Sequence, residues 1–489
     1  MTFDDKCIQD FFNAVSNASV TILDSVRNDE LVHVYSHLDA DGIAAAGIIA
    51  KALHRLDARF RIRITQWLDE KFLEEIIAEK PHTVIFTDLG TEYVALLKKK
   101  APDMKVIALD HHQIEGKPAE VSDESICVNP HLFGIDGSRD ISGSGVVYFV
   151  ARCMDPGNVD LAPIAIVGAL GDLQDKYDQR MLGGLNRKIV DDAVNAGLLI
   201  VEKDLIFFGR ETRPIHKALA STTSPYIPEI SGAEDKSLAF LVSLGIKPKE
   251  DDKWRALRDL SEDEKKKLCS ALANHMLAKG LHYEISSLIG HVYTLTHEEP
   301  WTPTRDGREF AVLLNAAGRM GKPGLGIAIC AGDRGSALED AMSILEEYRW
   351  TINKYLGWIM EKPERLKELE NIYLVYGEDF IDEKIIGAVS SILSTSLPNP
   401  EKPLIAYAKA KEGEIVKFSA RTTDALASRG VNLGKIMQIA AEKCLGKGGG
   451  HDVAAGAQVP VGNVDAFIRL VNELVGRVLA GGTFESGES

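Results

Sequence analysis

The stretch YSHLDADGIAAAG, residues 35–47, decides the fold of the N-terminal part of this 489-residue chain. It begins near the end of an apolar, β-rich run, residues 31–37, and leads into an alanine-rich helix former. His37, Asp39 and Asp41 are crowded between the two. Because open α/β sheets bind ligands outside the carboxyl ends of their strands, the stretch predicts a parallel α/β fold with chemistry where the first strand ends.

The alternation of strand and helix continues to residue 112. Helices are expected at residues 42–56, 69–80 and 91–100, and further strands at residues 59–67, 82–90 and 104–112. The helices are alanine-rich or amphipathic, whereas the strands are apolar or alternate between apolar and polar residues. This βαβαβαβ order predicts a parallel sheet with helices on both faces.

Acidic residues and histidines follow three of these strands. They are Asp39 and Asp41 after the first strand, Asp88 after the third, and Asp110, His111 and His112 after the fourth. Each has an ordinary explanation when taken alone: a turn, a helix N-cap for Asp88, or a buried core histidine. Together they meet at one edge of the sheet, where several carboxylates raise one another's pKa unless a cation neutralises them.

A divalent metal is the expected cation. Carboxylate and imidazole ligands together favour Mn²⁺, with Mg²⁺ or Zn²⁺ as alternatives. A further ligand is expected at Asp172, which follows an apolar helix, since an acid there is costly to bury without a cation; the alternative is an exposed helix end. This many ligands predict two ions, and two-metal sites usually hydrolyse phosphoryl groups.

Composition limits the class of protein. The chain is 45% apolar, and its formal net charge of −16 argues against a basic protein that coats nucleic acid without specificity. Its six scattered cysteines form no C-x-x-C pair and predict a reduced, cytoplasmic protein. No apolar run is long enough for a membrane span, and the acidic N-terminus lacks the layout of a signal peptide.

Taken together, the motifs resemble a known family. HLDADG, TDLG, DHH and GDLQD look like the four metal motifs of the DHH phosphoesterase superfamily, and GKGGGHDVAAG, residues 446–456, looks like the signature of its partner domain, DHHA1. LNAAGRMGKPGLGIAIC, residues 314–330, resembles a segment of RecJ-type exonucleases. The whole pattern is most similar to the archaeal RecJ-like, GINS-associated nucleases, which are relatives of Cdc45.

The resemblance implies a role for each motif residue. One ion would be held by Asp39 and Asp88, and the other by Asp41, Asp88, His111 and Asp172, so that Asp88 bridges. His37 is expected as a further ligand, although the first-motif histidine of many members falls at Tyr35 here. Asp110 would orient the neighbouring imidazoles, and His112 would contact the scissile phosphate or protonate the leaving oxygen. A water shared by the two ions would be the nucleophile.

The C-terminal motif predicts substrate binding. Gly448, Gly449 and Gly450 would let backbone N–H groups approach a phosphate, and His451 would add a donor; the alternative is a flexible loop between two helices. Upstream, KFSARTTD, residues 417–424, reads as a strand that carries Ser419 and Arg421. The resemblance implies that Arg421 and His451 face the metal site across a cleft. It also implies that Asn315 and Arg319 grip further phosphates.

Four regions are expected. They are a DHH metal-binding domain at residues 1–185, a mostly helical inserted domain at 186–300, a C-terminal α/β DHHA1 domain at 301–480, and a disordered tail at 481–489. The charge runs of the inserted domain are either solvated faces or a docking surface, because the archaeal relatives bind the GINS replication complex.

Three functions remain open. The favoured one is a metal-dependent exonuclease that trims single-stranded DNA or RNA in replication or repair, alone or within a replicative helicase assembly. The second is a phosphodiesterase for short oligonucleotides or cyclic dinucleotides, whose known members generally lack a hundred-residue insertion. The third is a replication scaffold like Cdc45, which can lose metal ligands, whereas every acidic position is filled here.

Overall fold

The chain divides into two compact units, Met1–Leu345 and Glu346–Ser489. The computed structural model describes residues 5–114, 126–222, 225, 227–281, 284–394, 397–410 and 414–482. Most of the predicted tail, residues 483–489, lies outside the described residues. Residues 301–345, which the sequence assigned to the third domain, belong to the first unit. They do so because their two helices pack against the helices of the DHH domain.

The first unit is built on a parallel sheet, as predicted. Its strands lie in the order β2-β1-β3-β4-β5, and every neighbouring pair is parallel. The strands are β1 (Val32–His37), β2 (Phe60–Thr65), β3 (Thr83–Thr87), β4 (Lys105–Leu109) and β5 (Ile126–Val128). Because the strand order reverses between β1 and β3, their carboxyl ends form the crevice in which such sheets bind ligands.

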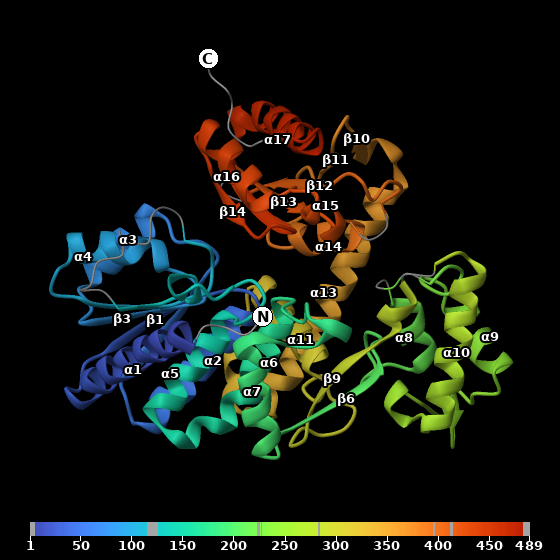
Figure 1. Ribbon diagram of the computed structural model, residues 1–489, viewed down its shortest axis with the longest axis horizontal. Helices are drawn as coiled ribbons and strands as arrows, with labels where there is room; N and C mark the ends of the chain where they lie inside the picture. The colour runs from blue at the N-terminus through green and yellow to red at the C-terminus, as the bar shows by residue number, and fades with distance from the viewer. Residues whose placement is uncertain are drawn as a thin grey trace. The chain divides into compact units, whose positions relative to one another are not determined.

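Helices cover both faces of this sheet (Figure 1). One face carries α3 (Glu70–Glu79) and α4 (Val94–Lys100), and the other carries α1 (Asp5–Arg27), α2 (Ala40–Arg55) and α5 (Gly143–Met154). Helix α6 (Ala162–Gly171) packs against α2 and α5. Helix α2 is buried along most of its length because its alanines and glycines let these neighbours approach closely.

A mostly helical insertion follows, as predicted. After α7 (Gly184–Asn195), strand β6 (Leu199–Leu205) pairs antiparallel with β9 (Ile289–Leu295). Between these strands lie α8 (Ile215–Ser221), α9 (Glu234–Ser243), the short pair β7 (Lys249–Glu250) and β8 (Lys253–Trp254), and α10 (Glu262–Ala278). The insertion has a hydrophobic core of its own, which includes Leu219, Leu241 and Leu272. Then α11 (Gly307–Arg319) and α12 (Pro323–Ala331) return to pack on α2, and α13 (Ser336–Glu361) runs into the second unit.

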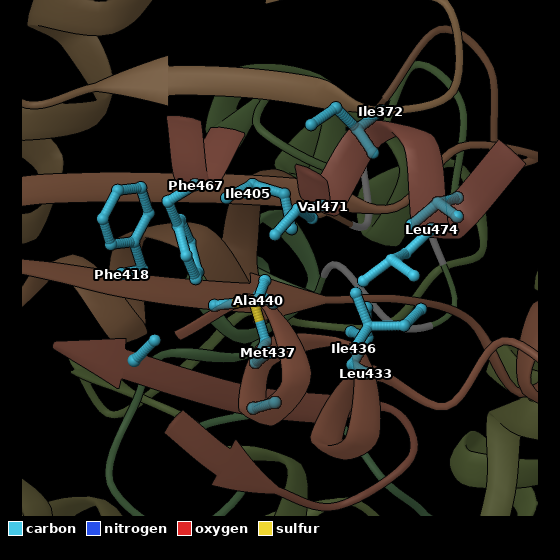
Figure 2. Packing of buried hydrophobic residues seen from close by; sticks show 14 of the residues in the cluster. Ile372, Ile405, Phe418, Leu433, Ile436, Met437, Ala440, Phe467, Val471 and Leu474 are labelled. Atoms are coloured by element: carbon cyan, nitrogen blue, oxygen red, sulfur yellow. The ribbon is translucent and has the colours of Figure 1, made fainter. Parts of the chain in front are cut away.

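The second unit is built on a mixed sheet of order β10-β11-β12-β13-β15-β14. Its strands are β10 (Leu366–Glu368), β11 (Tyr373–Tyr376), β12 (Leu404–Lys409), β13 (Ile415–Arg421), β14 (Lys447–Gly450) and β15 (Ala454–Pro460). Its helices are α14 (Ile386–Ser394), α15 (Asp424–Ser428), α16 (Leu433–Lys443) and α17 (Val464–Leu479). Phe418 of the sheet packs against Phe467 of α17 in the core shown in Figure 2, where Ile436 and Met437 of α16 also lie. No helix in the described part of the chain is both long and apolar enough to cross a membrane.

Candidate metal centre

The carboxyl ends of β1, β3 and β4 bring acidic and imidazole groups together, as the motifs predicted. Ligand atoms lie within 4.8 Å of one another in three overlapping groups. These groups are His37, Asp39 and Asp88; Asp41, His111 and Asp172; and Asp88, His111 and His112. All six residues expected as metal ligands are therefore in one cluster, to which α2 and the end of α6 contribute alongside the strands.

Asp39 is fixed by the start of α2. It is the N-cap, and its Oδ1 accepts a hydrogen bond from the Gly42 N–H at 3.1 Å. Its Oδ2 lies 3.0 Å from Nδ1 of His37. Burial raises the pKa of Asp39, but His37 and the Gly42 N–H outweigh burial and hold it below its usual range. The structure therefore places His37 in the cluster, whereas Tyr35 is buried among core side chains.

Asp41 sits in the first turn of α2 and points at the start of α5. Its carboxylate accepts the N–H groups of Gly143 at 2.7 Å and Ser144 at 3.1 Å. A Cβ on Gly168 of α6 would lie 2.4 Å from Asp41 Oδ1, so only glycine fits there. Burial, together with the charge of Asp172, raises the pKa of Asp41 against the opposing effect of His111.

Asp88 is the acid that the polypeptide leaves unsatisfied. It follows β3 in the left-handed region, at φ 58°, and its side chain is 1% exposed. Neither carboxylate oxygen accepts a hydrogen bond from any described residue. Burial, and then the charges of Asp41 and Asp39, raise its pKa well above the ordinary value. The alternative of a helix N-cap is not found, because the Thr91 N–H bonds Asp110 instead.

His111 presents one ring nitrogen to these carboxylates. Its Nδ1 lies 2.6 Å from the carbonyl oxygen of Gly137, which can only accept, so Nδ1 carries the proton. Its Nε2 lies 3.1 Å from Asp88 Oδ1, 3.7 Å from Asp41 Oδ2 and 3.8 Å from Asp172 Oδ2. A ring held in this way directs its Nε2 lone pair at the centre of the cluster.

Gln174 supports both His111 and Asp172, and the sequence analysis missed it. Its side-chain N–H₂ group donates to Asp172 Oδ2 and to the Gly137 carbonyl, both at 2.9 Å. Its Oε1 accepts a hydrogen bond from Asn186 at 2.7 Å, and the residue is fully buried. The signal was present in the motif GDLQD, where an amide stands between two acids at the end of an apolar helix.

Asp110 holds His112 rather than metal. Its Oδ1 lies 2.8 Å from Nδ1 of His112, and its Oδ2 accepts from the N–H and hydroxyl of Thr91. Burial lowers the pKa of His112, but Asp110 outweighs burial and raises it to about 9. The expectation that Asp110 orients both imidazoles needs one correction, because the carbonyl of Gly137 holds the His111 ring.

Asn315 and Arg319 of α11 lie beside the start of α2. Asn315 Oδ1 accepts a hydrogen bond from the Ala40 N–H at 3.1 Å. The charge of Arg319 contributes to the lowered pKa of Asp39, after burial and His37. A Cβ on Gly318 would lie 1.8 Å from the carbonyl oxygen of Leu38, so α11 can approach α2 only because this residue is glycine. Both residues are therefore part of the first unit and close to its metal cluster.

The predicted substrate residues of the second unit lie on its sheet. Arg421 ends β13, where its Nε donates to Ser391 Oγ at 2.7 Å and its Nη1 to Ser419 Oγ at 3.1 Å. Gly448, Gly449 and Gly450 form the edge strand β14, so the alternative of a flexible loop between two helices is wrong. A Cβ on Gly448 would lie 2.5 Å from the carbonyl oxygen of Met437, which explains the glycine through packing on α16.

His451 closes the turn after β14. Its N–H donates to the Ala454 carbonyl at 2.8 Å, and its own carbonyl accepts the Gly434 N–H at 3.0 Å. The turn is thereby tied to the first turn of α16. Phosphate binding by these residues remains a prediction.

The donor set fits a pair of divalent cations. Buried carboxylates of like charge and a buried acid that accepts no hydrogen bond from the described residues are stable together when cations neutralise them. The donors of this cluster are oxygen and nitrogen atoms, which suit Mn²⁺, whereas structural zinc sites are usually rich in thiolates. The fold and this site define an α/β domain with a candidate metal centre, followed along the chain by a second α/β domain.

Comparison with known proteins identifies the family. The DHH family N-terminal domain matches residues 31–169, the DHH-CID domain residues 207–289, and the DHHA1 domain residues 370–477. An uncharacterized protein of Methanocaldococcus jannaschii, MJ0831, is 35% identical over 453 residues, which are 92% of this chain and 94% of that protein. The chain belongs to the DHH/DHHA1 family.

Two solved structures share the fold. RecJ from Thermus thermophilus in complex with Mn²⁺ has a TM-score of 0.57 at 17% identity and covers 95% of this chain. This chain spans 55% of the length of that RecJ. CDC45 from Entamoeba histolytica has a TM-score of 0.62 at 11% identity, over 94% of this chain and 99% of that chain.

Proposed function

We propose that this protein is an exonuclease that hydrolyses phosphodiester bonds of single-stranded DNA or RNA from an end, in replication or repair. The observation that carries the proposal is Asp88, a buried carboxylate that accepts no hydrogen bond from the described residues and lies within 4.8 Å of ligand atoms of four other residues, His37, Asp39, His111 and His112. The similarity in fold to a RecJ that binds Mn²⁺ supports a metal-dependent reaction.

Two ions are proposed, with Mn²⁺ preferred and Mg²⁺ or Zn²⁺ as alternatives. His37, Asp39 and Asp88 would hold one, and Asp41, Asp88, His111 and Asp172 the other. When bound, such a pair supplies Lewis-acid stabilisation of the attacking and leaving oxygens of a phosphodiester.

His112 is the proposed proton donor. It is bonded to Asp110 through Nδ1, and its side chain is 43% exposed, so it can reach a bound phosphate. A pKa near 9 keeps its imidazole protonated at neutral pH, ready to donate to the leaving oxygen. Asp110 is a positioning residue that fixes the ring and stabilises its charge.

Polar groups in each unit are proposed to bind nucleic acid. Asn315 and Arg319 are proposed to grip backbone phosphates close to the metal centre. Ser419, Arg421, Gly448, Gly449, Gly450 and His451 are proposed to bind the terminal nucleotide, since a guanidinium can clamp a phosphate and glycine lets backbone N–H groups come close.

A digestion assay tests the proposal. End-labelled single strands of DNA and RNA would be incubated with the protein in Mn²⁺, and with the Asp88→Asn variant as control. Progressive shortening by the native protein alone is the expected result. Cleavage confined to dinucleotides or other very short substrates would replace the exonuclease with the small-substrate phosphodiesterase.

A role as a replication scaffold is the second candidate, favoured by the match of this chain to nearly the whole length of a CDC45 structure. GINS and the replicative helicase would then be partners. Absence of any hydrolysis in Mn²⁺, combined with co-purification with GINS, would establish this role in place of the nuclease.

A further inference from the structure

Leu173 occupies the turn that carries Asp172 into the metal cluster. At the end of α6, the Leu173 N–H bonds the Leu170 carbonyl at 3.2 Å and the Gln174 N–H bonds the Ala169 carbonyl at 3.0 Å. This is the Schellman pattern, in which glycine usually takes the left-handed position that Leu173 holds at φ 55°. Its side chain is 61% exposed, so the fold gains little packing from a leucine in this strained position.

Leu445 repeats the same arrangement in the second unit. At the end of α16, its N–H bonds the Glu442 carbonyl at 3.3 Å, and the Gly446 N–H bonds the Ala441 carbonyl at 2.8 Å. Its φ is 58° and its side chain is 83% exposed. It directly precedes residues 446–451, which include the three glycines and His451.

Two independent properties single out the same pair. Within the part of the chain that the structure describes, Leu173 and Leu445 are the leucines with positive φ, and they are also the two most exposed leucines. Each adjoins a motif that the proposed function uses, one for metal and one for substrate. Because neither leucine fills the core, each apolar side chain is available for a contact outside the fold.

We propose that Leu173 and Leu445 each form an apolar contact for the bases and sugars of bound single strands, each within its own unit; this inference rests on the proposed nuclease function. A nucleotide whose phosphate lies at the Asp172 cluster has its sugar and base within reach of the next residue. The flat faces of all bases are apolar, so contact with an aliphatic side chain is tolerant of sequence. The contact would raise the affinity for the strand without favouring any one base.

Glycine substitutions test this directly. Relief of backbone strain would change the melting temperature, whereas loss of the contact would change the KM for the strand. Leu173→Gly and Leu445→Gly should each raise the melting temperature by about 1–3 °C, since relief of the left-handed strain exceeds the entropy that glycine adds to the unfolded chain. Each should also raise the KM for a labelled 20-nucleotide strand about fivefold to tenfold. Hydrolysis of bis(p-nitrophenyl) phosphate, which has no base or sugar, should change by less than twofold.

Asp57 provides the matched control. It ends α2 in the same pattern, with its N–H on the His54 carbonyl and the Ala58 N–H on the Leu53 carbonyl, both at 3.1 Å. Its φ is 52°, it is exposed, and it lies at the opposite end of α2 from Asp39 and Asp41. Asp57→Gly should raise the melting temperature by a similar amount and leave the KM for the strand unchanged.

The outcomes separate this inference from the proposed function. A KM for the strand that stays at the native value in both leucine variants would overturn the inference, and so would a fall in melting temperature, which would show that the leucines pack within the fold. If the native protein cleaves no strand, the nuclease proposal fails. The leucine contact is then tested by fluorescence anisotropy, which measures the affinity of each protein for a labelled strand in Ca²⁺. An affinity of the Leu173→Gly and Leu445→Gly variants that is about fivefold or more below that of the native protein supports the contact. Unchanged affinity in both variants overturns it.

Discussion

The ends of β3 and β4 carry two buried aspartates with opposite surroundings. Asp110 receives five donors from the protein: the N–H and hydroxyl of Thr91, the N–H groups of His111 and His112, and Nδ1 of His112. Asp88 accepts none from the described residues. The pKa of Asp110 is accordingly lowered, because these donors and the histidine charges outweigh burial, whereas burial and neighbouring acids raise that of Asp88.

The difference separates an acid that supports a neighbouring histidine from an acid that we propose as a metal ligand. The polypeptide stabilises the charge of Asp110 by itself, so Asp110 is available to position His112. No donor among the described residues stabilises the charge of Asp88, which is why we propose a metal ion as its partner. The same residue type at neighbouring strand ends thus has two different surroundings, which differ in the number of hydrogen-bond donors.

The largest effect is expected from Asp88→Asn. Removal of the charge that both proposed ions share should lower strand hydrolysis by on the order of 10³-fold or more. Steady-state rates in Mn²⁺ measure this, with circular dichroism to show that the variant is folded. Retention of even a tenth of the native rate would refute the bridging role.

A smaller but still large effect is expected from Gln174→Met. Loss of the N–H₂ group removes the hydrogen bond that orients Asp172 and leaves the Gly137 carbonyl without its second donor. The Mn²⁺ affinity should therefore fall by roughly 10- to 100-fold. Calorimetric titration measures the dissociation constant. Asn158→Leu is the matched control, since Asn158 is also a buried amide, bonded to Arg55 and to the Ala151 carbonyl. Equal loss of metal affinity in both variants would reduce Gln174 to a general role in stability.

Stability without metal should change in opposite directions at the two strand ends. In EDTA, Asp88→Asn should raise the melting temperature, because it removes a buried charge with like-charged neighbours. Asp110→Asn should lower it, since the charged acceptor of five donors is lost, at a cost of about 1–3 kcal/mol. Thermal unfolding of both variants tests the comparison, and shifts of the same sign would contradict it.

The smallest effect concerns a third buried acid, Glu309 of α11. It accepts the Glu211 N–H at 2.7 Å and the Thr212 hydroxyl, yet burial and the charges of Asp306 and Glu211 raise its pKa to about 7. The folded state therefore holds a proton on Glu309 that the unfolded state has lost, and stability falls as pH rises from about 4.5 to 7.

Glu309→Gln should reduce the pH-dependent change in the free energy of unfolding by about 1–3 kcal/mol. Denaturant unfolding at pH 5.5 and 7.5 measures the change. A variant whose stability keeps the native pH dependence would show that Glu309 is not the group responsible.

Much of this architecture could be predicted from the sequence, because strand ends are local features. Apolar runs followed by HLDADG, TDLG and DHH mark where three strands stop, and parallel pairing then brings those ends together. The apolar helix that precedes Asp172 predicted it as a further ligand, and the structure places it in the cluster.

The rest depends on packing between distant segments. Nothing local to α11 shows that Asn315 and Arg319 lie beside Ala40 and Asp39 in the first unit, rather than in a third domain. Gln174 was likewise overlooked, because a glutamine acquires its supporting role only when Gly137 and Asn186 come to meet it. The three glycines were expected to serve phosphate alone, but Gly448 packs closely on α16 and Gly450 packs closely on β15.

The most direct test of the account is the number of ions that the metal centre binds. Calorimetric titration of the metal-free protein with Mn²⁺, repeated on Asp88→Asn, measures it. Two ions for each native chain are expected, with loss of tight binding in the variant, because Asp88 is shared by both proposed ligand sets. Two ions bound by Asp88→Asn with native affinity, or none bound by the native protein, would contradict it.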